Sequence, residues 1–145
     1  MLNIRPITTA DVDACYDIVL TNWTPTVATR FLSEVSQVWS DMNDPPIYYV
    51  AINDGKVIGF VSIMCSFIMH NIWDLTWVNV HPDAHGEGIG TELLEHALRE
   101  IIECGGTAVH LMTKTPDFFE GFGFGVVKDY GGWNLMSLWL GPVEL

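Results

Sequence analysis

Three glycines in five residues, Gly86, Gly88 and Gly90, are the chemically most distinctive feature of this sequence. They follow an apolar segment that ends at Val80 and lead directly into an amphipathic one. Glycine inside a helix costs about 1 kcal/mol relative to alanine, so a compensating ligand is expected. The first N–H groups of a helix have no internal partner and carry partial positive charge, and glycine lets a bulky anion approach them. The stretch therefore predicts an anion site, with a pyrophosphate as the expected anion.

The common nucleotide motifs do not account for these glycines. A dinucleotide-binding loop would read G-x-G-x-x-G after the first strand of a βαβ unit, with an acidic residue about 20 positions later. Here the order is G-x-G-x-G, and it follows a late strand. The phosphate loop G-x-x-x-x-G-K-[ST] does not occur. A different phosphate ligand is needed.

The cysteines and histidines do not predict a metal site. Cys15, Cys65 and Cys104 are far apart, and a proline and a glycine-rich turn keep His81 and His85 off a regular helical face. This spacing fits reduced thiols in a cytoplasm best. The opening MLNIRPITTADVD lacks the features of a secretory signal. The most apolar run, residues 57–69, is shorter than the ~20 residues that span a bilayer. We therefore expect a cytoplasmic protein that holds no metal.

The net charge and the chain length indicate which partners and how many domains to expect. The net charge is −12, from 18 acidic against 6 basic residues, which disfavours binding to nucleic acid or to anionic membranes. The chain has 145 residues, and 49% of them are hydrophobic. We therefore expect residues 1–145 to form one domain with a buried core.

The elements that position the glycines can be predicted from periodicity and turn signals. Strands are expected at residues 3–5, 47–52, 57–67, 73–80, 108–112, 124–128 and 133–140. Helices are expected at 8–20, at 26–41, from the glycines to 103, and over a short segment from 115. The N-D-G turn at 53–56 predicts a hairpin. This order predicts an α/β (α+β) fold in which helices cover a mixed sheet.

Four sequence blocks, which follow one another along the chain as they do in the family, resemble the GNAT superfamily of N-acetyltransferases. The strand ending V-H-P, followed by H-G-E-G-I-G at 85–90, is similar to the family's V-x-P and [RQ]-x-x-G-x-[GA]. FFEGFGF at 118–124 is similar to F-Y-E-x-x-G-F, and I-R-P-I-T at 4–8 with Asp11 resembles the usual opening. The resemblance spans the chain. It implies a GNAT fold of six to seven strands and about four helices, with the fourth and fifth strands splayed apart.

The same resemblance implies acetyl-coenzyme A as the acetyl donor. Its pyrophosphate would be held by six backbone amides, those of Gly86, Glu87, Gly88, Ile89, Gly90 and Thr91. Val78 and Val80 would pair with the pantetheine amides as a neighbouring strand does. His85 replaces the usual arginine or glutamine, so its role is expected to shrink to a single hydrogen bond. Phe119 replaces the tyrosine that commonly protonates the departing thiolate, so it is expected in the core or as a wall along the pantetheine arm.

Acyl transfer to an amine also needs a neutral nitrogen and therefore a base. Asp74 is the first candidate, because many members carry a glutamate at the start of this strand. Partial desolvation between Trp73 and Leu75 would raise its pKa into a useful range. A carboxylate satisfied by a turn is the alternative interpretation. His70 is the second candidate because imidazole needs little tuning, although a solvated loop histidine would look the same.

The expected reaction is acetyl transfer to a primary amine of a small molecule. The acidic composition favours a polyamine or aminoglycoside, whereas the segment at 110–115 resembles the amino-acid N-acetyltransferase branch. Trp23 and Tyr48 are expected to shape the acceptor pocket. Two alternatives stay open: a protein N-terminal acetyltransferase, and a non-catalytic sensor or scaffold that binds acetyl-coenzyme A, for which Phe119 is the argument. The apolar residues 133–140 permit a homodimer.

Overall fold

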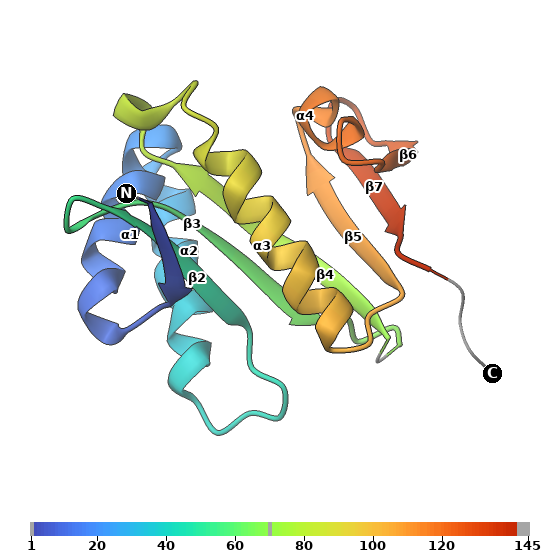
Figure 1. The fold of residues 1–145 in the computed structure, drawn as a ribbon, viewed down its shortest axis with the longest axis horizontal. Coiled ribbons are helices and arrows are strands. Elements are labelled where there is room, and N and C mark those ends of the chain that lie inside the picture. Colours follow the sequence, from blue (N-terminus) through green and yellow to red (C-terminus); the bar gives the residue numbers. More distant parts are fainter. Residues whose placement is uncertain (1, 70, 142–145) are drawn as a thin grey trace.

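The computed structural model describes residues 2–69 and 71–141 and contains a seven-stranded mixed sheet in the order β1-β2-β3-β4-β5-β7-β6 (Figure 1). The strands are β1 (Asn3–Pro6), β2 (Ile47–Asn53), β3 (Lys56–Cys65), β4 (Ile72–Val80), β5 (Ala108–Thr113), β6 (Gly125–Asp129) and β7 (Asn134–Trp139). The helices are α1 (Val12–Asn22), α2 (Pro25–Val35), α3 (Ile89–Glu103) and α4 (Pro116–Glu120), with 3-10 turns η1 (Thr9–Asp11), η2 (Ser36–Trp39) and η3 (Pro82–Ala84). The predicted fold class and element order are confirmed.

Three predicted boundaries were wrong. The first helix begins as a 3-10 turn and runs on to Asn22, and the second is an α-helix only to Val35 before it tightens into η2. The third strand ends at Cys65 rather than at residue 67, because the Ser66 N–H donates to the Ile72 carbonyl (2.8 Å) and closes a loop. Phe67 is consequently 90% exposed despite its apolar character.

Helices cover both faces of the sheet and create two cores. Figure 1 shows α3 crossing one face and α1 and α2 lying on the other. The α3 core contains Leu93, Leu94, Ala97 and Ile101 of the helix and Trp73, Leu75, Val109 and Leu111 of β4 and β5. The α1–α2 core contains Cys15, Ile18, Val19 and Phe31 of the helices and Tyr48, Val50 and Phe60 of β2 and β3.

The two central strands pair only at one end. β4 and β5 run parallel through three residue pairs, of which Asp74 with His110 is the last. Beyond this pair the strands diverge, as Figure 1 shows on the side where α3 begins. Ser62 of β3 pairs with Trp77 and Ile63 pairs with Leu75, so Thr76 is the extra residue of a β-bulge in β4, and such a bulge bends the strand that carries it. The predicted splay between the fourth and fifth strands therefore has a local cause.

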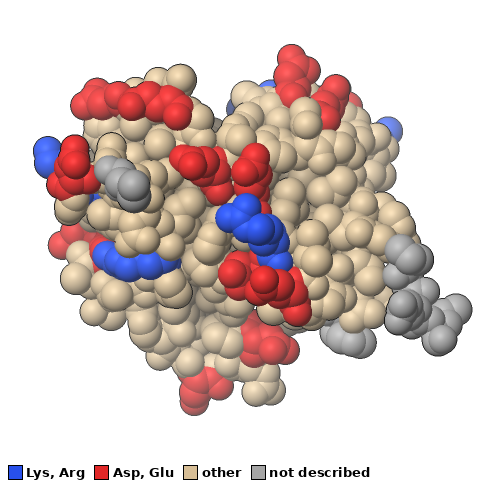
Figure 2. Space-filling model, viewed as in Figure 1, with Lys and Arg blue, Asp and Glu red and all other residues tan. Residues whose placement is uncertain are grey.

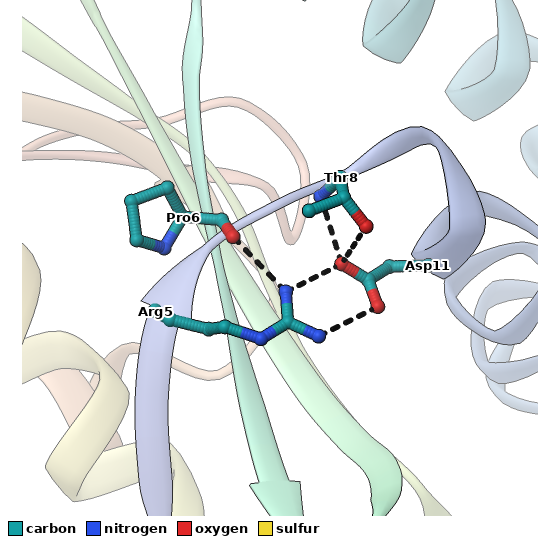
Figure 3. Close-up of polar contacts among 4 residues, drawn as sticks. All are labelled: Arg5, Pro6, Thr8 and Asp11. Carbon is teal, nitrogen blue, oxygen red and sulfur yellow. Dashed lines mark hydrogen bonds and ion pairs between the residues drawn. The ribbon is translucent and has the colours of Figure 1, made fainter.

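An ion pair fixes the first turn of the chain (Figure 3). The Arg5 guanidinium donates to both carboxylate oxygens of Asp11, at 2.7 and 3.0 Å, and the Thr8 N–H donates to Oδ2 at 2.8 Å. The hydrogen bond from Arg5, reinforced by Thr8 and opposed by burial, lowers the pKa of Asp11 from 3.8 to about 2. Asp11 thereby ties the end of β1 to the start of α1.

We expect Asp11→Asn to lower the free energy of unfolding at pH 7 by about 2 kcal/mol, which follows from the pKa difference between folded and unfolded states. Because the folded-state pKa is depressed, this contribution is full above pH 3.8 and disappears as the pH falls towards 2. Urea unfolding of wild type and variant across this range is the measurement. Asp17→Asn, at an exposed α1 position, is the control. A wild-type-to-variant difference that is independent of pH would contradict the role of Asp11.

Candidate active site

A pocket of about 300 Å³ lies where α3 begins, on the side where β4 and β5 have separated. It is lined by Val80, Ala84, His85, Gly86, Gly88, Ile89, Gly90, Thr91 and Phe118. Its walls thus come from the end of β4, the glycine turn, the first turn of α3 and α4. Elements distant in sequence therefore meet at the glycines.

The glycines of this turn leave room that other residues would fill. Gly86 and Gly88 have φ values of +82° and +79°, a left-handed conformation that side chains rarely adopt, and a Cβ atom at either would meet no atom within 4 Å. The open space lies outside the protein, next to the backbone. Within residues 2–69 and 71–141, no side chain caps the N-terminus of α3 at Gly88. The amides of this turn are therefore free to bind an anion.

The pocket includes most of the residues predicted to hold the donor, but not all of them. Val80, His85, Gly86, Gly88, Ile89, Gly90 and Thr91 line it, whereas Val78 and Glu87 do not. Phe118 lines it in place of Phe119. Phe119 is only 8% exposed and packs in the α3 core against Phe124, with ring centroids 5.9 Å apart. The phase of the short α4 helix turns Phe118 towards the pocket and Phe119 into the interior.

His85 contacts the end of β4. Its Nε2 lies 2.8 Å from the Val80 carbonyl oxygen, so Nε2 carries a hydrogen and donates it. The same oxygen accepts a second hydrogen bond, at 2.8 Å, from the side-chain amide of Asn22 at the end of α1. Two donors therefore occupy the Val80 carbonyl. Asn22 was not identified from the sequence, because nothing in its local pattern shows that α1 ends beside β4.

Asp74 lies at the point where β4 and β5 part, on the face opposite α3. Its neighbours Trp73 and Leu75 belong to the α3 core, so the alternation along the strand directs Asp74 to the other face. Burial raises the pKa of the Asp74 carboxyl above its ordinary value, and the nearby His110 partly opposes this shift. His70, the other predicted base, lies outside the described residues. His110 was missed, although its position between apolar Val109 and Leu111 repeats the pattern of Asp74.

Aromatic side chains border this face above Asp74. Trp23 stacks on Trp133, with centroids 6.5 Å apart and planes 13° apart, and its Nε1 donates to Oδ1 of Asn79 at 3.1 Å. Lys114 Nζ lies 5.0 Å from the centre of the Trp133 ring. The stack thus joins the β4 side of the splay to the β5 side. Tyr48, expected here, is instead 2% exposed and belongs to the α1–α2 core.

Acidic side chains outnumber basic ones on the face that carries α3 (Figure 2). Figure 2 shows carboxylates spread over the face that carries α3, with few basic side chains among them. Among the described residues, no helix has the length and apolarity needed to cross a bilayer. In the same part of the chain, no three histidine, cysteine or acidic side chains gather as metal ligands would.

Comparison with known proteins identifies the family. The profile of the acetyltransferase (GNAT) domain matches residues 44–126. An aminoalkylphosphonate N-acetyltransferase of Salmonella typhimurium is 28% identical over 117 residues, which are 76% of this chain and 73% of that protein.

Solved structures show the same fold. A GNAT-family structure from Desulfovibrio desulfuricans superposes with a TM-score of 0.87 at 18% identity, covering 96% of this chain and 99% of the other. The PaiA N-acetyltransferase of Thermoplasma acidophilum, solved with coenzyme A, gives 0.77 at 18% identity and covers 97% and 99%. With the profile match over more than half of the chain, these findings show that the protein is an acetyltransferase and belongs to the GNAT family.

Proposed function

We propose that this enzyme transfers an acetyl group from acetyl-coenzyme A directly to a primary amine of a small molecule. The observation that carries the proposal is the uncapped, glycine-lined N-terminus of α3, which opens on a pocket beside the splayed β4 and β5. A pyrophosphate needs donors that the protein itself does not use, and this turn provides them.

The donor would be held mainly by backbone. The amides of Gly86, Glu87, Gly88, Ile89, Gly90 and Thr91 would donate to the pyrophosphate. Val78 and Val80, on the edge of β4 that β5 has left, would border the pantetheine arm. Because the Val80 carbonyl already accepts two hydrogen bonds, we assign strand-like pairing with pantetheine mainly to Val78. His85 would then stabilise the glycine turn rather than bind phosphate. Phe118 would form the apolar wall along the pantetheine arm in place of Phe119.

On the other face, Asp74 would provide the carboxylate of the proton-accepting site. An amine reaches the enzyme mainly as an ammonium ion and becomes nucleophilic only after losing a proton. The raised pKa of Asp74 makes its carboxylate a stronger base than an exposed aspartate. No tyrosine is needed for turnover, because a thiol with a pKa near 8.5 is already a fair leaving group. We therefore infer that Phe119 does not prevent catalysis.

The acceptor is proposed to be a polyamine, an aminoglycoside or an amino-acid-type amine. Support for a small amine comes from the Salmonella relative, which is an aminoalkylphosphonate N-acetyltransferase. The stacked Trp23 and Trp133, together with Asp74, would give such a molecule aromatic and polar contacts. A protein N-terminus is the second candidate acceptor.

The chain is proposed to act as one domain and in the cytoplasm, in keeping with an odd number of cysteines that lie far apart in the sequence. The exposed outer strand β6, next to β7, offers an edge for a homodimer.

Two measurements test the proposal and separate it from a non-catalytic sensor. Calorimetry with acetyl-coenzyme A should show saturable binding. Release of free thiol should then be continuous when spermidine, kanamycin or amino acids are added. Binding without thiol release for any amine or peptide N-terminus would support the sensor, and absence of binding would exclude both functions.

Trp23→Ala should raise the KM for the acceptor about 10-fold, because it removes the stack on Trp133 and the hydrogen bond to Asn79. The KM for acetyl-coenzyme A should stay within about twofold of wild type, since the donor pocket lies on the other side of β4. Steady-state kinetics with each substrate varied in turn measure both constants. Trp39→Ala, on η2, is the matched control. An unchanged KM for the acceptor would show that the acceptor does not bind beside Trp23.

A further inference from the structure

Asp74 is part of a polar row that crosses three strands. In the sheet register it pairs with His110 of β5, and His110 pairs with Ser137 of β7. Paired residues on adjacent strands point to the same face, about 4.8 Å apart. Val109 and Leu111 belong to the α3 core, so His110 points to the opposite face together with Asp74. Three polar side chains thus lie in line at the base of the splay.

Among the described residues, Asp74 is the charged side chain that the sheet register places beside His110. On its own strand the same-face neighbours are Ala108 and Met112, and Ser137 is uncharged. Further along this face, Lys114 lies over Trp133, and on the α2 side Glu34 accepts a hydrogen bond of 2.6 Å from the Trp77 ring. His110 lowers the pKa of Asp74 against the effect of burial, Asp74 in turn contributes, after burial, to the raised pKa of Cys65 at the end of β3, and Asp74 and His110 are both half-buried. Asp74 and His110 therefore form a pair of acid and base across the β4–β5 register.

We propose that His110 is a catalytic residue that, together with Asp74, forms the site accepting the proton of the acceptor amine. This inference rests on the proposed acetyl transfer. An N–H bond of the ammonium breaks and an N–H bond forms on the His110 imidazole, whose positive charge the Asp74 carboxylate balances. The freed electron pair attacks the thioester carbonyl carbon, a C–N bond forms, and the C–S bond breaks with its electron pair on sulfur. The second excess proton of the nitrogen passes to the thiolate, giving amide and free thiol.

The division of work between the two residues follows from their chemistry. Histidine is the side chain that takes up and releases a proton most readily near neutral pH. A carboxylate on the adjacent strand stabilises the imidazolium and draws the cationic amine towards the pair. The pair lies at the last residue pair of β4 and β5, at the base of the region where these two strands separate.

The test compares His110→Gln with wild type across pH 6 to 10, with acetyl-coenzyme A and whichever of spermidine, kanamycin or an amino acid wild type acetylates fastest. At pH 7, His110→Gln should lower kcat/KM about 100-fold, because the variant cannot accept the proton. Near pH 10 the deficit should shrink to less than about fivefold, since much of the amine is then already neutral. Asp74→Asn combined with His110→Gln should lose little more than the worse single variant, because the two act as one unit.

Other outcomes overturn the inference. A deficit of equal size at every pH would assign His110 a structural role, and no deficit at pH 7 would exclude it from the reaction. His96→Gln, a half-buried histidine on α3 beside Tyr49, is the matched control and should keep wild-type kinetics. Acetyl transfer by wild type that does not depend on His110 contradicts this inference alone. Absence of any transfer by wild type contradicts the proposed function as well.

Discussion

Gly88→Glu should reduce the affinity for acetyl-coenzyme A by at least about 100-fold while the protein stays folded. The carboxylate would enter the open space beside the backbone that the pyrophosphate is proposed to fill, and it would repel the phosphates. A hydrogen bond to a charged group contributes about 1.5–3 kcal/mol, so the loss of one or two such bonds reaches this size. Calorimetry with acetyl-coenzyme A measures the effect.

Gly55→Glu is the matched control for this substitution. Gly55 lies in the β2–β3 hairpin turn, has a similar φ of +75°, and a Cβ atom there would also meet nothing within 4 Å. Both variants therefore gain the same charge and a similar backbone strain of about 1–2 kcal/mol, which thermal unfolding should show equally. Only Gly88→Glu should lose the donor. Equal affinity in the two variants would contradict a phosphate site at the start of α3.

Asp74→Asn should lower kcat/KM for the acceptor by about 100- to 1,000-fold at pH 7 and leave the affinity for acetyl-coenzyme A unchanged. The asparagine keeps the size of the side chain but neither accepts a proton nor balances positive charge. Thiol release under saturating donor measures the rate, and calorimetry measures donor binding. Asp83→Asn, on the exposed η3 turn, is the control. Unchanged rates would remove Asp74 from the mechanism.

The pH dependence of this variant has a defined sign. Because only the ionised carboxylate is active, wild-type kcat/KM should rise with pH through a limb above the ordinary aspartate range, since burial raises the pKa of Asp74. This limb should be altered in Asp74→Asn. The raised pKa also means that the folded state binds the proton more tightly than the unfolded state, so ionised Asp74 costs stability once the pH exceeds the ordinary aspartate value. The variant should therefore be no less stable than wild type at pH 7, which excludes unfolding as the cause of lost activity.

Local signals in the sequence predicted those parts of the fold that depend on local chemistry. The N-D-G turn requires positive φ values, and Asp54 and Gly55 have them, at +50° and +75°. The glycines before α3 and the apolar stripe along that helix predicted its start and its buried face. Asp74 could be placed because the residues flanking it are apolar.

Contacts between distant segments were not predictable in the same way. The occupied Val80 carbonyl depends on Asn22, which belongs to a helix nearly 60 positions earlier in the sequence. Similarly, pairing between β4 and β5 brings His110 to Asp74 across the whole of α3. Whether Phe118 or Phe119 faces the pocket depends on the rotation of α4. This helix has five residues and is too short for sequence periodicity to determine its rotation. The end of β3 at Cys65 was missed because exposed Phe67 and Ile68 continue its apolar pattern.

Amide-resolved NMR during titration with coenzyme A tests most directly whether the backbone N–H groups at the N-terminus of α3 bind a diphosphate. The account predicts that the N–H resonances of Gly86, Gly88 and Gly90 shift downfield together on saturation, as new hydrogen bonds to phosphate form. Acetyl-pantetheine, which lacks the diphosphate, should bind more weakly and leave them in place. Saturable binding of coenzyme A that does not move these three amides would contradict the account.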